Sequence, residues 1–167
     1  MKKKIAILAS AMLVAIVALV VSAMPSSAQQ PPPPIAVEEL TPRSVFTDDV
    51  DLKAKVKHNG TSEIANDKNP SRTVTARITV QPGAQFPWHS HAGPVVVNVV
   101  SGELTYVSSE DCVERAYPAG TAFLDPGFGH VHTAFGTSDE PTVLMATFFS
   151  APAQGSLLIP AEPGCGT

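Results

Sequence analysis

Residues 83–102 read GAQFPWHSHAGPVVVNVVSG, and residues 120–132 read GTAFLDPGFGHVH. Each stretch contains one His-x-His pair, so four of the five histidines of the chain lie here, namely His89, His91, His130 and His132. Side chains at positions i and i+2 of a β-strand point to the same face of a sheet. Two such strands facing each other would build a metal site, because imidazole is a common ligand of transition metals.

Short runs of alternating apolar and polar residues surround these stretches, with the period of a strand that has one buried face. We expect strands over residues 50–56, 73–80, 95–100, 104–107, 113–117, 122–124, 130–135 and 143–149. The runs 95–100 and 104–107 flank Ser101-Gly102 and predict a hairpin, whereas the polar residues 62–71 predict a loop. Many short strands separated by turn residues indicate an all-β sandwich or barrel.

The spacing of glycine and histidine in the two stretches resembles the two sequence motifs of the cupin superfamily. The residues that carry the match are Gly83, His89, His91, Val95 and Gly102 in the first motif, and Gly120, Pro126 and His132 in the second. The resemblance covers about residues 72–150. It implies a small antiparallel jelly-roll β-barrel.

The resemblance also implies that His89, His91 and His132 coordinate one metal ion inside the barrel. Two departures from the family pattern are visible. Val95 stands where cupins usually have a glutamate as fourth ligand, and the second motif has one extra residue between Pro126 and His132. Three neutral imidazoles would leave the ion with its full positive charge and at least one open coordination position. We expect one divalent transition metal, and Zn, Fe, Mn, Ni and Cu all suit such a donor set to different degrees.

Other residues near the motifs have several interpretations. His130 is a fourth ligand, a hydrogen-bonding residue near the site, or a residue of the entrance turn that faces water. Five aromatic residues either line an apolar pocket around the metal or belong to the ordinary core: Phe86, Trp88, Phe123, Phe135 and Phe148. We expect four acidic residues to lie in turns or on the surface rather than to act as catalytic acids: Glu103, Asp111, Glu114 and Asp125.

The N-terminus has the pattern of a secretory signal, with three lysines, an apolar run over residues 5–23 and the small residues Ser26-Ser27-Ala28. The run is long for a signal core and close to the minimum for a membrane span, so an uncleaved anchor is the alternative. Both interpretations place the folded domain outside the cytoplasm. We therefore divide the chain into a signal or anchor (1–28), a Pro-rich linker (29–45), a cupin barrel (46–152) and a C-terminal tail (153–167).

Charge and cysteine content limit the partners. The first 28 residues contain three of the 11 Lys and Arg residues and none of the 15 Asp and Glu residues, so the remaining chain is strongly acidic. This balance argues against nucleic acid and anionic membranes as partners.

Both cysteines, Cys112 and Cys165, follow the signal, and an even number in an exported chain favours a disulfide that holds the tail onto the domain.

Three functions fit these observations. The first is a metal-dependent enzyme of oxygenase or isomerase/lyase type that acts on a small organic molecule, with no catalytic residue identified beyond the metal ligands. The second is a non-catalytic module that binds a small ligand or the metal itself. The third is a purely structural exported barrel. Cupins often pair through their edges, and the apolar strands make a homodimer a further expectation.

Overall fold

The computed structural model describes residues 33–58 and 61–165. The predicted signal or anchor lies outside these residues, as do Asn59 and Gly60. The regular elements of the described residues are all β-strands, and every pairing between them is antiparallel. Over the same residues, no helix is long and apolar enough to cross a membrane. The all-β, antiparallel fold class predicted from the sequence is confirmed.

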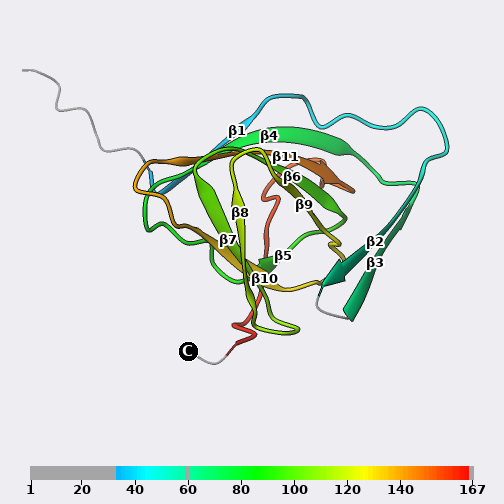
Figure 1. Ribbon diagram of the computed structural model, residues 1–167. Helices are drawn as coiled ribbons and strands as arrows, with labels where there is room; N and C mark the ends of the chain where they lie inside the picture. Colours follow the sequence, from blue (N-terminus) through cyan, green and yellow to red (C-terminus); the bar gives the residue numbers. More distant parts are fainter. Residues whose placement is uncertain (1–32, 59–60, 166–167) are drawn as a thin grey trace, which may run out of the picture. The chain divides into compact units, whose positions relative to one another are not determined.

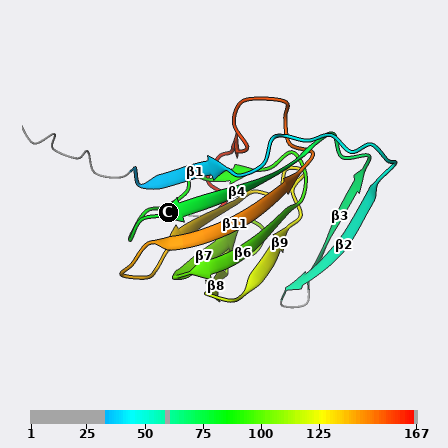
Figure 2. The ribbon, with the colours of Figure 1, turned by 90° about the horizontal axis from the view of Figure 1, so that it is seen from above.

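Two five-stranded sheets form the domain (Figures 1 and 2). The first has the order β1 (Ile35–Glu39), β4 (Thr73–Val80), β11 (Thr142–Phe149), β6 (Val95–Ser101) and β9 (Ala122–Asp125). The second has the order β12 (Ile159–Pro160), β5 (His89–Ser90), β10 (His132–Gly136), β7 (Glu103–Ser108) and β8 (Glu114–Pro118). Strands of the first sheet lie side by side in Figure 2, and the second sheet packs behind them.

The core lies between the two sheets and follows from the alternation in the sequence. Along β4 every second residue, from Val74 to Val80, is buried, and β11 buries Leu144, Ala146 and Phe148 in the same way. These side chains form one cluster with residues of the second sheet such as Leu104. Because each sheet buries one face against the other, the strands that carry the histidines are held on a packed scaffold.

The predicted hairpin between residues 95–100 and 104–107 is wrong. Strand β6 pairs with β11 and β9, whereas β7 pairs with β10 and β8, so the two runs belong to different sheets. The turn between them carries the chain from one sheet to the other. Gly102 has a φ of 72° there, and a Cβ at this position would lie 2.6 Å from Thr142 Oγ1. The glycine signals a tight turn, but it does not determine which strands pair on either side.

The segment predicted as a loop over residues 62–71 is largely a strand. β3 (Thr61–Lys68) pairs with β2 (Asp51–His58) in a separate two-stranded sheet, which Figures 1 and 2 show beyond β9. The sequence of β3 is mostly polar because its burial is sparse. Ala65 and Asp67 are buried, while Ile64 is exposed, and Ser150 Oγ donates a hydrogen bond to Asp67 Oδ2 at 2.8 Å.

Both ends of the domain extend beyond the predicted boundaries. Strand β1 lies within the range predicted as linker, yet it pairs with β4 along its whole length. Strand β12 lies within the range predicted as tail and pairs with the histidine strand β5, opposite His89 and Ser90. The chain from Pro32 onward forms one compact unit. Backbone pairing at the sheet edges, which leaves Val37 and Ile159 exposed, explains why the apolar pattern did not reveal these strands.

Candidate metal centre

Three of the predicted ligands, His89, His91 and His132, lie together between the sheets. His89 begins β5, His91 follows it directly, and His132 begins β10, where it is the register partner of His89. The ring centroids of His89 and His132 are 4.2 Å apart, and those of His91 and His132 are 5.2 Å apart. One nitrogen from each of the three rings lies within 4.8 Å of the others, and all three residues are buried.

The Nδ1 atom of each ring is held by an oxygen. His89 Nδ1 lies 2.7 Å from the carbonyl oxygen of Pro87, and His91 Nδ1 lies 2.9 Å from that of Leu157. His132 Nδ1 lies 3.0 Å from Asp125 Oδ2. Because these oxygens only accept hydrogen bonds, each ring donates through Nδ1 and keeps Nε2 as an unprotonated acceptor. The tautomer that coordinates a metal is therefore fixed in all three rings.

The electrostatics of the centre keep His89 and His91 neutral. Burial, together with the neighbouring rings of His132 and His91, lowers the pKa of His89 to about 3. Burial also lowers the pKa of His91, although the charge of Asp125 opposes the shift. Both rings are therefore neutral at physiological pH, the form in which imidazole binds a metal.

Asp125 is the main residue that the sequence analysis placed wrongly. It was expected in a turn or on the surface, but it ends β9 on the opposite sheet and is 1% exposed. The Tyr106 hydroxyl donates to its Oδ2 at 2.8 Å, and the Gly127 N–H donates to its Oδ1 at 2.8 Å. Burial raises the pKa of Asp125, but the interactions with His132, His91 and Tyr106 together outweigh burial and hold the pKa well below its usual value.

Tyr106 and the tail residue Leu157 also belong to the centre, and sequence reasoning missed both. The ring of Tyr106 stacks on that of His132 with centroids 4.8 Å apart, and burial raises the pKa of its hydroxyl. Leu157 contributes only its backbone carbonyl, which no sequence pattern marks. Tyr106 lies in the apolar strand β7, and Asp125 lies in Asp125-Pro126-Gly127, a sequence typical of a turn, so neither residue was recognised as part of the site.

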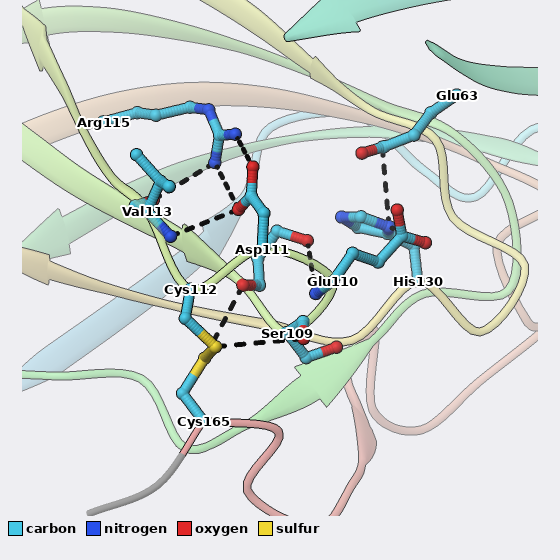
Figure 3. Close-up of polar contacts among 10 residues, drawn as sticks. Glu63, Ser109, Glu110, Asp111, Cys112, Val113, Arg115, His130 and Cys165 are labelled. Atoms are coloured by element: carbon cyan, nitrogen blue, oxygen red, sulfur yellow. Dashed lines mark hydrogen bonds and ion pairs between the residues drawn. A yellow bond between two sulfur atoms is a disulfide. The ribbon is translucent and has the colours of Figure 1, made fainter. Parts of the chain in front are cut away.

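The C-terminal tail is fixed to the domain by a disulfide. Cys112 and Cys165 are bonded, with a sequence separation of 53, and Figure 3 shows the bridge below the turn that precedes β8. In the chain-entropy account, a loop of this length stabilises the fold by about 4 kcal/mol. Because Leu157 lies in the segment that the bridge closes, the disulfide also keeps a carbonyl oxygen next to His91.

A small cavity of about 50 Å³ adjoins the three rings. Phe86, Phe123 and Phe148 line it, as does Val95, while Trp88 and Phe135 are not among its lining residues. A single water molecule needs about 10–15 Å³ by this measure. The cavity therefore has room for a metal ion with a few water molecules, or with a ligand of few atoms.

His130 lies apart from the three rings. Its ring centroid is 6.1 Å from that of His132, but its Nδ1 lies 3.5 Å from the carboxylates of Glu63 and Glu110. It is 8% exposed, so the interpretation as a residue facing water is wrong. Of the other acidic residues, Asp111 pairs with Arg115, Glu103 accepts a hydrogen bond from Thr137, and Glu114 is exposed.

The donor set fits a transition metal. Three buried imidazoles converge, each is oriented by a hydrogen bond from its other nitrogen, and a cavity adjoins them. Three protein ligands and one open position are typical of catalytic rather than structural metal sites. Zn, Fe, Mn, Ni and Cu are all compatible with imidazole donors, as the sequence predicts.

Comparisons with known proteins agree with this fold. The family model described as "Cupin domain" matches residues 76–148, and no curated protein matches the chain. Among solved structures, the polyketide cyclase RemF from Streptomyces resistomycificus is 15% identical, with a TM-score of 0.46 over 55% of this chain and 61% of that one. The Cupin_2 domain of an XRE family transcriptional regulator from Enterobacter cloacae is 18% identical, with a TM-score of 0.46 over 69% and 95%.

An oxalate oxidase in complex with glycolate is 22% identical, with a TM-score of 0.41, and the match covers 47% of this chain and 41% of that one. The chain thus spans less than two thirds of the oxidase and of the cyclase. The match to the family model includes His89, His91 and His132 together with the strands that carry them. The chain therefore contains a cupin domain, over residues 76–148.

Proposed function

We propose that the chain binds one divalent transition metal through Nε2 of His89, His91 and His132, and that this centre acts on a small organic molecule. The observation that carries the proposal is the fixed tautomer of all three rings, because each Nδ1 is held by an oxygen. Such partners orient metal ligands and raise their basicity. A protein that used these histidines only for packing would have no need to hold all three in the coordinating form.

The chain's own residues would orient the centre and exclude water. Asp125 fixes His132, the Leu157 carbonyl fixes His91, and the apolar walls of the cavity exclude bulk water. A bound metal would supply a Lewis-acidic or redox-active centre with an open coordination position. The small cavity limits the substrate to a few non-hydrogen atoms unless the tail residue Leu158, which lines the cavity, moves aside.

A non-catalytic binding module is the second candidate, and one observation favours it. Among the described residues that line the cavity, Asp125 and Tyr106 are the polar side chains other than the three histidines. They are hydrogen-bonded to each other, and the pKa of Tyr106 is raised while that of Asp125 is lowered, so neither is suited to exchange a proton near neutral pH. The enzymatic proposal, of oxygenase or isomerase/lyase type, therefore requires the chemistry to take place at the metal.

Metal analysis of the purified protein separates the two candidates. We expect at least one equivalent of a divalent transition metal per chain in protein isolated from its native host. Oxygen uptake or substrate conversion by iron-, manganese-, nickel- or copper-loaded protein would support the enzyme. Zinc without turnover of small organic acids would support the binding module. Protein that takes up none of these metals at the three histidines would contradict both.

The substitution Asp125→Asn tests the support of His132. His132 and the Gly127 N–H reach different oxygens of Asp125, and an amide has an accepting oxygen at only one of these positions, so one hydrogen bond is lost or the ring changes tautomer. We expect metal affinity to fall about 10–100-fold, as for other partners of metal-ligating histidines. Chelator competition measures it, with the exposed Asp139→Asn as the matched control. Unchanged affinity in Asp125→Asn would contradict the assigned role.

We propose that the N-terminal segment either exports the protein as a signal or holds it in a membrane as an anchor. In both cases the domain lies outside the cytoplasm. The Cys112–Cys165 disulfide supports this location, because such bonds persist in oxidising compartments.

A homodimer formed through apolar strands is a further proposal, and light scattering of the purified domain tests it.

A further inference from the structure

A second group of metal-ligating side chains lies next to the three-histidine centre. It consists of Glu63 from β3, Glu110 from the turn between β7 and β8, and His130 from the loop before β10. One ligand atom from each lies within 4.8 Å of the others. Figure 3 shows both glutamate carboxylates at the His130 ring, reaching it from different segments of the chain. Three separate elements thus direct their polar ends to one place.

The distances in this group fit coordination better than hydrogen bonding. His130 Nδ1 lies 3.5 Å from Glu63 Oε2 and 3.5 Å from Glu110 Oε1. Hydrogen bonds from nitrogen to oxygen are usually about 2.7–3.2 Å long. Two ligand atoms that each lie about 2.1 Å from a tetrahedral metal ion are about 3.4 Å apart. The spacing is therefore that of neighbouring ligands around an ion.

Charge and burial support the same conclusion. Two carboxylates would neutralise a divalent cation, and the imidazole adds a nitrogen donor that favours a transition metal over calcium. The side chains of His130 and Glu63 are 5% and 13% exposed, while Glu110 is 57% exposed and leaves a path from solvent. A hollow of about 340 Å³, lined by all three residues, has room for water ligands.

We propose that Glu63, Glu110 and His130 form a second divalent-cation site, separate from the three-histidine centre. The site takes a divalent transition metal such as Zn²⁺ through two carboxylate oxygens and one imidazole nitrogen, with water completing the coordination. It also ties the β2–β3 hairpin to the domain, because Glu63 is the ligand that the hairpin supplies. The proposal does not depend on occupancy of the first centre.

Calorimetric titration of the chelator-treated full chain with ZnCl₂ tests the proposal. We expect two equivalents for the wild-type chain and one equivalent for Glu63→Gln and for Glu110→Gln, which keep the side-chain shape but remove the charge. Glu114→Gln, an exposed substitution on β8, is the matched control and should keep two. Glu110→Gln keeps the test usable if Glu63→Gln disturbs the hairpin, since Glu110 is largely exposed.

The titration also separates the two centres. A single equivalent that persists in His91→Ala and disappears in Glu63→Gln or Glu110→Gln supports this site and contradicts the three-histidine one. A single equivalent that disappears in His91→Ala and persists in both glutamine variants overturns this site. In that case the three residues form only an ion-pair contact between the hairpin and the domain. Anomalous diffraction at the zinc edge should place the second ion beside His130.

Discussion

Replacement of His91 by alanine should abolish metal uptake at the three-histidine centre. Two imidazoles would remain, and the cavity wall on the His91 side is apolar, with the Phe148 ring centroid 5.3 Å away. Nothing there can replace the lost donor. We expect the variant to bind one equivalent less than the wild-type chain at micromolar metal, measured by elemental analysis after gel filtration.

The same substitution should also destabilise the metal-free protein, because His91 anchors the tail. Its loss removes the hydrogen bond to the partly buried Leu157 carbonyl oxygen, which costs about 1 kcal/mol. His91→Gln separates the two effects. Its amide can donate to Leu157, so it should regain stability in thermal unfolding and still fail to bind metal. Normal metal uptake by either variant would show that His91 is not a ligand.

The residues of the site differ in how readily the sequence reveals them. His89, His91 and His132 are found because regular spacing on strands brings them to one face, and spacing is a property of the chain alone. Asp125 is not found, since its role depends on the packing of β9 against β6 and on the position of His132 in the other sheet. Contacts between sheets have no period in the sequence.

The strands also differ in how readily the sequence reveals them. β4 and β11 alternate over eight residues and were predicted closely, because each buries one face. β1, β3 and β12 are held mainly by backbone pairing, which depends little on side-chain identity, so their side chains carry little signal. The hairpin prediction failed for a related reason, since the choice of partner strand is a property of the whole fold.

The position of negative charge explains how the centre differs from the cupin pattern. Cupins usually place a glutamate ligand where this chain has Val95, and Val95 is the register partner of Asp125. Both residues line the cavity. The carboxylate of this chain therefore acts on the centre through His132 rather than by direct ligation. A metal here would keep more of its positive charge toward the cavity, which favours binding of an anionic ligand.

Val95→Glu should add a fourth ligand to the centre. We expect it to destabilise the metal-free protein and to strengthen metal binding. Val95 is 1% exposed, and directly opposed residues on neighbouring strands have Cβ atoms about 4.5–5.5 Å apart. The new carboxylate would thus be buried close to the charged Asp125. In the metal-free protein we expect a loss of several kcal/mol of stability, since a buried charge without a partner is costly.

With metal present, the added carboxylate gains a cation as its partner and contributes a fourth ligand. We expect metal affinity to rise at least about 10-fold, equivalent to about 1.4 kcal/mol. The difference in Tm between metal-loaded and metal-free protein should widen accordingly. Val95→Gln is the control, because it has the same length without the charge and should destabilise the protein without the gain in affinity. If Val95→Glu bound metal no more tightly than Val95→Gln, the ion would not lie within reach of β6, and the three histidines would have to hold it elsewhere or not at all.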